Sequence, residues 1–269
     1  TYKFYDTSPI FDYFFKKNGG KVYSCFQKNL LAYPLSCFVY ADILFTLGKG
    51  QGRICNKLGG VVKKTIPVGS LTMESKWFNK KKDLKNVPKA DILIIGINTI
   101  TCDHHYADKD YEETYYGNYL LWLKNLSKDF PNRRIIIKHH SDYSIDPREK
   151  EILNKTGIKI QIDNLSANST YAYMFKSKII LSFASTMIVE ALGHNIKAYF
   201  LDPNLKNQQF LSDVQKIKNF RISSYNKLKL KITKFKQKKT IIKNKDSFCL
   251  KSNNTSFKIS KNLIKSNFN

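Results

Sequence analysis

The chain has 269 residues, of which 42% are hydrophobic and 13% aromatic, which is enough to bury a core in one large domain or two small ones. Its formal net charge of +25 comes mostly from lysine, in a chain also rich in asparagine and isoleucine; this codon-biased composition, without a cluster of arginine and aromatic residues, argues against a specific nucleic-acid-binding module. Apolar runs of strand length exclude a membrane-spanning helix, and five dispersed cysteines without a CxxC pair indicate a reduced, cytoplasmic protein and exclude a disulfide framework.

The first segment, residues 1–77, predicts a small Rossmann-like domain. Short apolar runs that end near glycine indicate strands, and a helix closed by Gly59 and Gly60 lies between the second and the third. The sequence does not begin with Met, so we expect a fragment whose amino-terminal domain is incomplete. The predicted strands are 21–26, 41–47 and 64–68, and the predicted helix is 51–58.

A lysine-rich linker, residues 78–89, leads to a second segment, residues 90–235, in which strands alternate with helices. This alternation predicts an α/β fold with a mostly parallel sheet and helices on both faces. Residues 236–269 are rich in lysine, asparagine and serine, and we interpret them as a basic, partly disordered tail. The predicted strands are 92–95, 134–138, 159–162, 179–183, 198–201 and 220–223; the predicted helices are 115–128, 147–156, 169–175, 186–193 and 225–234.

The turn after the strand 179–183 carries the most informative polar residues. Ligands of an open parallel sheet bind beyond the carboxyl ends of its strands. Ser182, Ser185 and Thr186 surround the start of a helix, where free amides and the helix dipole favour an anion. Glu190 follows one helical turn later and is placed to accept hydrogen bonds from ribose hydroxyls. The alternative is an ordinary helix cap followed by a surface glutamate.

This segment, Ser-Thr-x-x-x-Glu-Ala-Leu-Gly followed by an aliphatic strand and Asp-Pro, resembles the donor site of GT-B glycosyltransferases. It is most similar to the group of bacterial Kdo transferases, sialyltransferases, CDP-glycerol glycerophosphotransferases and surface-carbohydrate biosynthesis proteins. The resemblance implies a GT-B-like fold of two Rossmann-like domains and sugar transfer from a nucleotide-activated donor in surface polysaccharide biosynthesis. It implies that Ser182, Ser185 and Thr186 bind the donor phosphate and that Glu190 binds the ribose. The proline that usually follows the helix is absent here, where Asn195 stands.

The same group often carries a His-Pro pair after an earlier strand, and His139 matches that histidine, with His140 in place of the proline. The resemblance implies that this pair contacts the nucleotide; the alternative is a loop histidine without a ligand. In GT-B folds the loop that holds Asn164 and Ser166 often lies beside the base, so we expect these residues to bind the nucleotide. A helix-capping role is the alternative for Ser166.

Three further residues are candidates for the cleft between the domains. Gly96 ends a strand, and Lys49 and Arg53 lie in and after a glycine-rich run that is not a Walker A motif; a flexible turn is the alternative. The acidic loop 101–113, with Asp108 and Asp110 in a DxD pattern, lies well beyond its strand, so we interpret it as solvated and predict no metal site. The sequence contains no GxSxG elbow, so we do not expect a serine hydrolase.

The resemblance implies a nucleotide sugar as donor substrate, with CMP- or CDP-linked donors favoured over UDP-linked ones, and no cofactor. The expected partners are a glycan or lipid-linked acceptor and an anionic membrane surface at the inner face of the plasma membrane, with no specific nucleic acid. The catalytic base is not assigned. The alternatives are a sugar-nucleotide epimerase of the same fold, a non-catalytic basic protein that binds polyanions, and a partial enzyme that binds its ligand without turnover.

Overall fold

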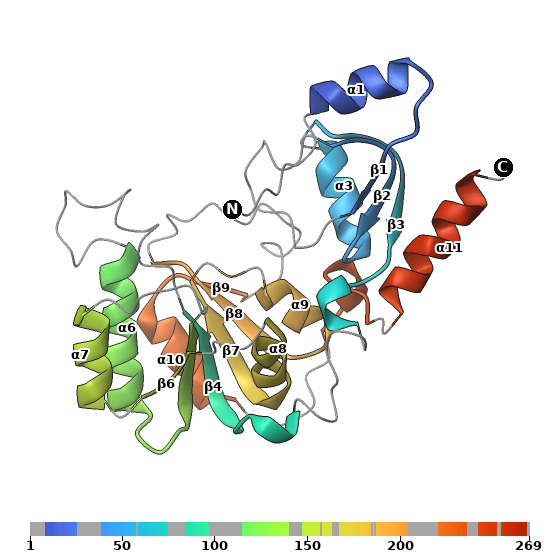
Figure 1. Cartoon of the computed structure of the whole chain (residues 1–269). Coiled ribbons are helices and arrows are strands. Elements are labelled where there is room, and N and C mark those ends of the chain that lie inside the picture. Colours follow the sequence, from blue (N-terminus) through green and yellow to red (C-terminus); the bar gives the residue numbers. More distant parts are fainter. Residues whose placement is uncertain are drawn as a thin grey trace.

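The structure is a computed structural model of the chain. It describes residues 9–25, 39–57, 59–74, 84–96, 115–139, 147–156, 158–162, 167–183, 185, 187–203, 220–235, 242–251 and 254–267. Two separate parallel sheets organise these residues, one of three strands and one of six (Figure 1). We call the small sheet with its helices the first unit and the large sheet with its helices the second unit. The predicted α/β class is confirmed.

The first unit has strands in the order β1-β2-β3, all parallel. Its central strand β2 is the most buried of the three, and it places Ile43 and Phe45 in a small core together with Val68. The elements are α1 (Pro9–Lys17), β1 (Tyr23–Cys25), β2 (Tyr40–Thr46), α3 (Lys49–Lys57), β3 (Val61–Pro67) and the short 3-10 helix η1 (Leu71–Met73).

The end of the chain returns to the first unit, where α11 (Thr255–Asn267) runs beside the small sheet (Figure 1). Ile259 and Leu263, one helical turn apart, pack on its core, and the Thr255 hydroxyl donates to the Val68 carbonyl at 3.1 Å. The preceding 3-10 helix η6 (Lys245–Ser247) packs so close to Gly48 that a Cβ there would lie 2.5 Å from the Ser247 carbonyl oxygen. The interpretation of residues 236–269 as a basic, partly disordered tail therefore missed an ordered helix.

The second unit has six parallel strands in the order β6-β5-β4-β7-β8-β9. This is the doubly wound arrangement, in which the chain leaves the first strand in one direction and later crosses back to its other side. The strands are β4 (Ala90–Ile95), β5 (Ile135–His139), β6 (Lys159–Ile162), β7 (Ser177–Ser182), β8 (Lys197–Leu201) and β9 (Arg221–Ile222). The helices are η2 (Leu84–Asn86), α6 (Tyr115–Asp129), α7 (Pro147–Thr156), α8 (Ala167–Lys176), α9 (Met187–Gly193) and α10 (Tyr225–Thr233).

Helices cover both faces of the large sheet and form two cores (Figure 1). Strand residues alternate between them: Ile136 and Ile180 belong to the core under α8 and α9, whereas Ile137 and Leu181 belong to the core under α6, α7 and α10. A parallel sheet buried on both faces explains why its strands are continuous apolar runs in the sequence. No helix in the described part of the chain is long and apolar enough to span a membrane.

Candidate functional site

The carboxyl ends of three neighbouring strands meet where the strand order reverses. Strand β4 pairs with β5 on one side and with β7 on the other, and Ile95 is level with both Lys138 and Ser182. The next position along each strand brings Gly96 beside His139, since the Gly96 amide donates to the Lys138 carbonyl at 3.0 Å. A switch point of this kind is where open α/β sheets bind ligands.

The sheet separates the predicted site residues into two groups. Ser182 and Lys138 continue the alternation of Ile180 and Ile136 and so face α8 and α9. His139 faces the opposite side, where it contacts α7. Sequence analysis expected His139 and Ser182 at the carboxyl ends of their strands, but it did not distinguish the two faces of the sheet.

On the face of α8 and α9, the turn before α9 uses its own hydroxyls as caps. The Ser182 hydroxyl accepts a hydrogen bond from the Ser185 amide at 2.8 Å, and the Ser185 hydroxyl accepts one from the Met187 amide at 3.2 Å. These bonds satisfy two amides that the anion-site hypothesis left free. An anion at this turn therefore has to displace Ser185 from the Met187 amide, or to use other donors. Thr186 lies outside the described residues.

Glu190 is not a surface glutamate, because only 3% of it is exposed. The Tyr171 hydroxyl on α8 donates to its Oε2 at 2.9 Å and lies 2.6 Å from the hydroxyl of Thr72, which in turn lies 2.8 Å from that of Ser70. Burial, and next the negative charge of Glu190, raise the pKa of Tyr171 well above its usual value. This chain of polar groups links Glu190 to the end of β3, so the predicted ribose-binding residue lies where the two units meet.

On the other face, His139 is buried, with 1% of its surface exposed. Its Nε2 lies 2.8 Å from Oε1 of Glu149 on α7, and the same oxygen accepts the Tyr119 hydroxyl of α6 at 2.8 Å. Its Nδ1 has no hydrogen-bond partner among the residues that the structure describes. The ring packs so tightly on Gly96 that a Cβ there would lie 2.4 Å from Nδ1. His139 is thus a buried residue at the end of strand β5 and does not lie in a loop.

Sequence analysis missed Lys138, a lysine that is only 4% exposed at the end of a central strand. Its Nζ donates to the His139 carbonyl at 2.7 Å. A lysine that is nearly fully buried is rare unless it is paired or functional. The signal was present in the sequence, because Lys138 directly follows the apolar run of Ile135, Ile136 and Ile137.

No family model matches this sequence, and no curated protein matches it. Solved structures do match its fold. A putative UDP-N-acetylglucosamine 2-epimerase from Listeria monocytogenes superposes with a TM-score of 0.60 at 10% identity, over 97% of this chain and 70% of that one. The UDP-GlcNAc 2-epimerase from Neisseria meningitidis, bound to UDP-GlcNAc, gives 0.56 at 14%, over 96% and 74%. The wall teichoic acid polymerase TagF, soaked with CDPG, gives 0.50 at 12%, over 84% and 57%.

The chain has a GT-B-like fold. At these identities the likeness shows the fold alone, so it does not identify the particular group of GT-B proteins. The predicted fold is confirmed.

The cleft candidates of the first unit lie on α3. Lys49 and Arg53 are exposed one helical turn apart, and the glycine-rich run forms the first turn of this helix instead of a flexible loop. Gln51 accepts the amides of Leu47 and Gly48 at 2.7 and 3.4 Å, so the turn before α3 is capped by the chain itself. His140, Asn164, Ser166 and the acidic loop 101–113 lie outside the described residues.

Proposed function

We propose that this chain binds a nucleotide-activated sugar at the switch point of its large sheet and transfers the sugar to an acceptor hydroxyl in surface polysaccharide biosynthesis. One observation carries the proposal: β5, β4 and β7 end at the same level. On one face of the sheet, these ends bring together the buried Lys138, the serine-lined turn before α9 and the buried Glu190. A cation, hydroxyl groups and a carboxylate are the partners that a phosphate and a ribose need.

The chemistry of such a transfer is mainly positioning and charge stabilisation. Lys138 supplies a positive charge for the donor phosphates, and Ser182, Ser185 and Thr186 supply hydroxyl donors. Glu190 accepts a ribose hydroxyl, while Tyr171 keeps its bond to Oε2. On this proposal the bond between the anomeric carbon of the sugar and the phosphate oxygen breaks, and the acceptor oxygen bonds to that carbon. The nucleotide leaves with its phosphate, and the proton of the acceptor hydroxyl goes to a base that these residues do not provide.

His139 and Gly96 complete the proposed nucleotide site from the other face. The Nε2 of His139 lies 2.8 Å from the Glu149 carboxylate, so the ring nitrogen that remains for a ligand on this proposal is Nδ1. That atom lies against Gly96, at the mouth of the switch point. His140, Asn164 and Ser166 remain proposed contacts to the nucleotide, as the resemblance implies.

The donor is proposed to be CMP- or CDP-linked, with UDP-linked sugars as the alternative. The matched structures carry both kinds of ligand, UDP-GlcNAc in one and CDPG in another. The acceptor is proposed to be a glycan or a lipid-linked glycan, and the place of reaction the cytoplasmic face of the membrane.

Isothermal titration calorimetry with CMP, CDP and UDP tests the site directly. We expect one of the nucleotides to bind, and the Ser185→Ala, Glu190→Gln double variant to bind it at least tenfold more weakly. The matched control is Ser127→Ala with Glu151→Gln, a half-buried serine on α6 and an exposed glutamate on α7. The proposal fails if no nucleotide binds, or if the site variant and the control bind equally well.

A second function, epimerisation of a sugar nucleotide, is favoured by the fold neighbours that are UDP-GlcNAc 2-epimerases. Product analysis separates the two functions, since an epimerase converts its UDP-sugar without an acceptor. A new sugar nucleotide formed from UDP-GlcNAc alone would support the second function and exclude transfer as the primary one. Release of free nucleotide that depends on an added acceptor would support transfer.

A further inference from the structure

Helix α1 presents its apolar side to solvent. Ile10 is 68% exposed, Phe11 63%, Phe14 54% and Phe15 47%, whereas Asp12 of the same helix is only 5% exposed. A surface helix of a globular protein normally buries its apolar stripe and exposes its charges. Four large apolar side chains in contact with water on one nine-residue helix therefore point to a binding surface.

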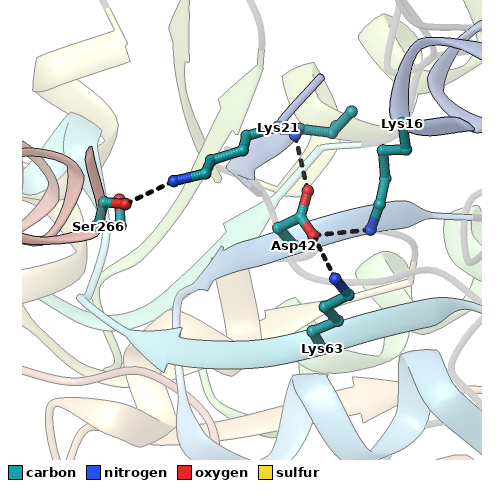
Figure 2. A network of polar contacts seen from close by, with 6 residues as sticks. Lys16, Lys21, Asp42, Lys63 and Ser266 are labelled. Carbon is teal, nitrogen blue, oxygen red and sulfur yellow. Dashed lines mark hydrogen bonds and ion pairs between the residues drawn. The ribbon is translucent and has the colours of Figure 1, made fainter. Parts of the chain in front are cut away.

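Polar contacts fix this orientation. Lys16 of α1 forms an ion pair with Asp42 of β2, with Nζ and Oδ1 2.9 Å apart, and its ammonium lies 4.7 Å from the centre of the Tyr40 ring. Figure 2 shows Lys16 and Lys63 both reaching the Asp42 carboxylate. The Tyr13 ring also packs edge-on against Tyr40, with centroids 5.6 Å apart. Because Lys16 holds the inner side of the helix, the phenylalanines stay outside.

The surface around the helix is basic and partly apolar. A groove beside α1 is lined by Tyr13, Phe14, Val39, Tyr40 and Val61. The described part of the first unit from α1 to β3 has two acidic residues, and neither adds an unpaired negative charge to the surface. Asp12 is buried, and Asp42 is paired with two lysines. The exposed charges on α1, on β3 and at the end of α3 are all lysines, namely Lys17, Lys57, Lys63 and Lys64.

We propose that α1 is an interfacial helix that docks this chain onto the surface of an anionic lipid bilayer. Phe11, Phe14 and Phe15 enter the boundary between headgroups and acyl chains, and the lysines contact lipid phosphates. Aromatic residues on one side and lysines at the rim are the composition of helices that lie in a membrane interface. The helix lies at the end of the first unit that is far from the large sheet, where a flat surface can reach it (Figure 1).

Charge favours lipid over a second copy of the chain as the occupant. Two copies would each bring a net charge of +25, so their lysine-rimmed helices would repel each other at moderate salt. An anionic membrane instead attracts the same lysines within a Debye length of its surface. The proposal goes beyond the reaction itself, since docking needs only α1 and its rim.

Vesicle sedimentation with the full chain tests this proposal. We expect the protein to pellet with vesicles of equal parts phosphatidylglycerol and phosphatidylcholine, and to remain in solution with pure phosphatidylcholine. The Phe11→Ser, Phe14→Ser variant should partition at least tenfold less into the anionic vesicles. The control is Phe257→Ser on α11, whose side chain is 64% exposed and lies on another helix; it should bind as the unmodified chain does.

A second pair of variants tests the charged rim without altering the aromatic side. Lys17→Gln with Lys64→Gln should weaken sedimentation at low salt, whereas Lys124→Gln with Lys150→Gln, which changes exposed lysines of the second unit, should not. Equal sedimentation of the phenylalanine variant and the unmodified chain overturns the proposal, as does no binding to anionic vesicles. A lipid-free dimer in sedimentation velocity that Phe11→Ser and Phe14→Ser abolish also overturns it, because the face then joins two copies.

Discussion

Removal of the Glu149 carboxylate should be among the most destabilising single changes in the second unit. Glu149 is 0% exposed, and its Oε1 accepts hydrogen bonds from both Tyr119 and His139. In Glu149→Ala both donors lose their acceptor inside a closed core, at about 1–3 kcal/mol for each unsatisfied group. We expect a total loss of about 2–6 kcal/mol in the free energy of unfolding, the sum of the costs for the two donors.

Glu151 provides a matched control two residues further along the same helix. Its carboxylate lies 2.6 Å from Lys155 in an exposed pair, so Glu151→Ala should cost no more than about 0.5 kcal/mol. The two variants make the same change of helix propensity in α7. Their difference therefore isolates the buried hydrogen bonds. Tyr119→Phe, which removes one donor and keeps the ring, should fall between them at about 1 kcal/mol.

Urea unfolding followed by the fluorescence of Trp122 measures this difference within the second unit. Trp122 is buried, with its ring centroid 5.5 Å from that of Phe183, and a Trp77→Phe background leaves it the only tryptophan. Because the chain has two units, a probe inside the second avoids mixing two transitions. If Glu149→Ala and Glu151→Ala unfold with free energies within about 0.5 kcal/mol of each other, the carboxylate does not hold this core together.

Two further predictions concern the contact between the units and the anchor of α1. Tyr171→Phe should lower the free energy of unfolding by about 1–2 kcal/mol, because Glu190 and Thr72 both lose the hydroxyl that joins them; an unchanged urea midpoint would contradict this. Burial raises the pKa of Asp42, but hydrogen bonds from Lys16, the Val22 amide and Lys63 outweigh it and lower that pKa from 3.8 to about 2. A lowered carboxylate pKa stabilises the fold above the unfolded value, so this contribution should be lost as the pH falls from about 4 towards 2. In circular-dichroism melts Asp42→Asn should flatten that part of the pH dependence, and an unaltered profile would exclude the ion pair as its source.

The strands of the large sheet were predictable from the sequence because that sheet is parallel and largely buried. Its central strands are short apolar runs bounded by polar or glycine residues, and this pattern is local. The ends of the predicted strands lie no more than three residues from those observed. Helix α11 was missed because lysine, serine and asparagine dominate its composition. Its signal was only the spacing of Ile259 and Leu263, which gains meaning once the small sheet offers a face to cover.

The position of the candidate site was predictable, but its partners were not. The rule that ligands meet strand ends placed Gly96, His139 and Ser182 at one edge without knowledge of the register. Glu149 and Tyr119 lie 10 and 20 residues from His139 in the sequence and meet it only when α6 and α7 cover the sheet. Burial of Glu190 likewise depends on a tyrosine from another helix. Hydrogen bonds of this kind arise from tertiary packing, and no periodicity in the sequence encodes them.

The separation of the two polar clusters by the sheet gives them different roles. Glu149, at the centre of one cluster, is fully buried between α6, α7 and the sheet, so its first effect is on the stability of the second unit. Glu190, in the other cluster, is joined through Tyr171 to Thr72 of the first unit, so it is part of the contact between the two units. A ribose that bonds to Glu190 therefore adds to a polar chain that already reaches the end of β3. On the proposed function, binding at the switch point and the contact between the two units would depend on the same carboxylate.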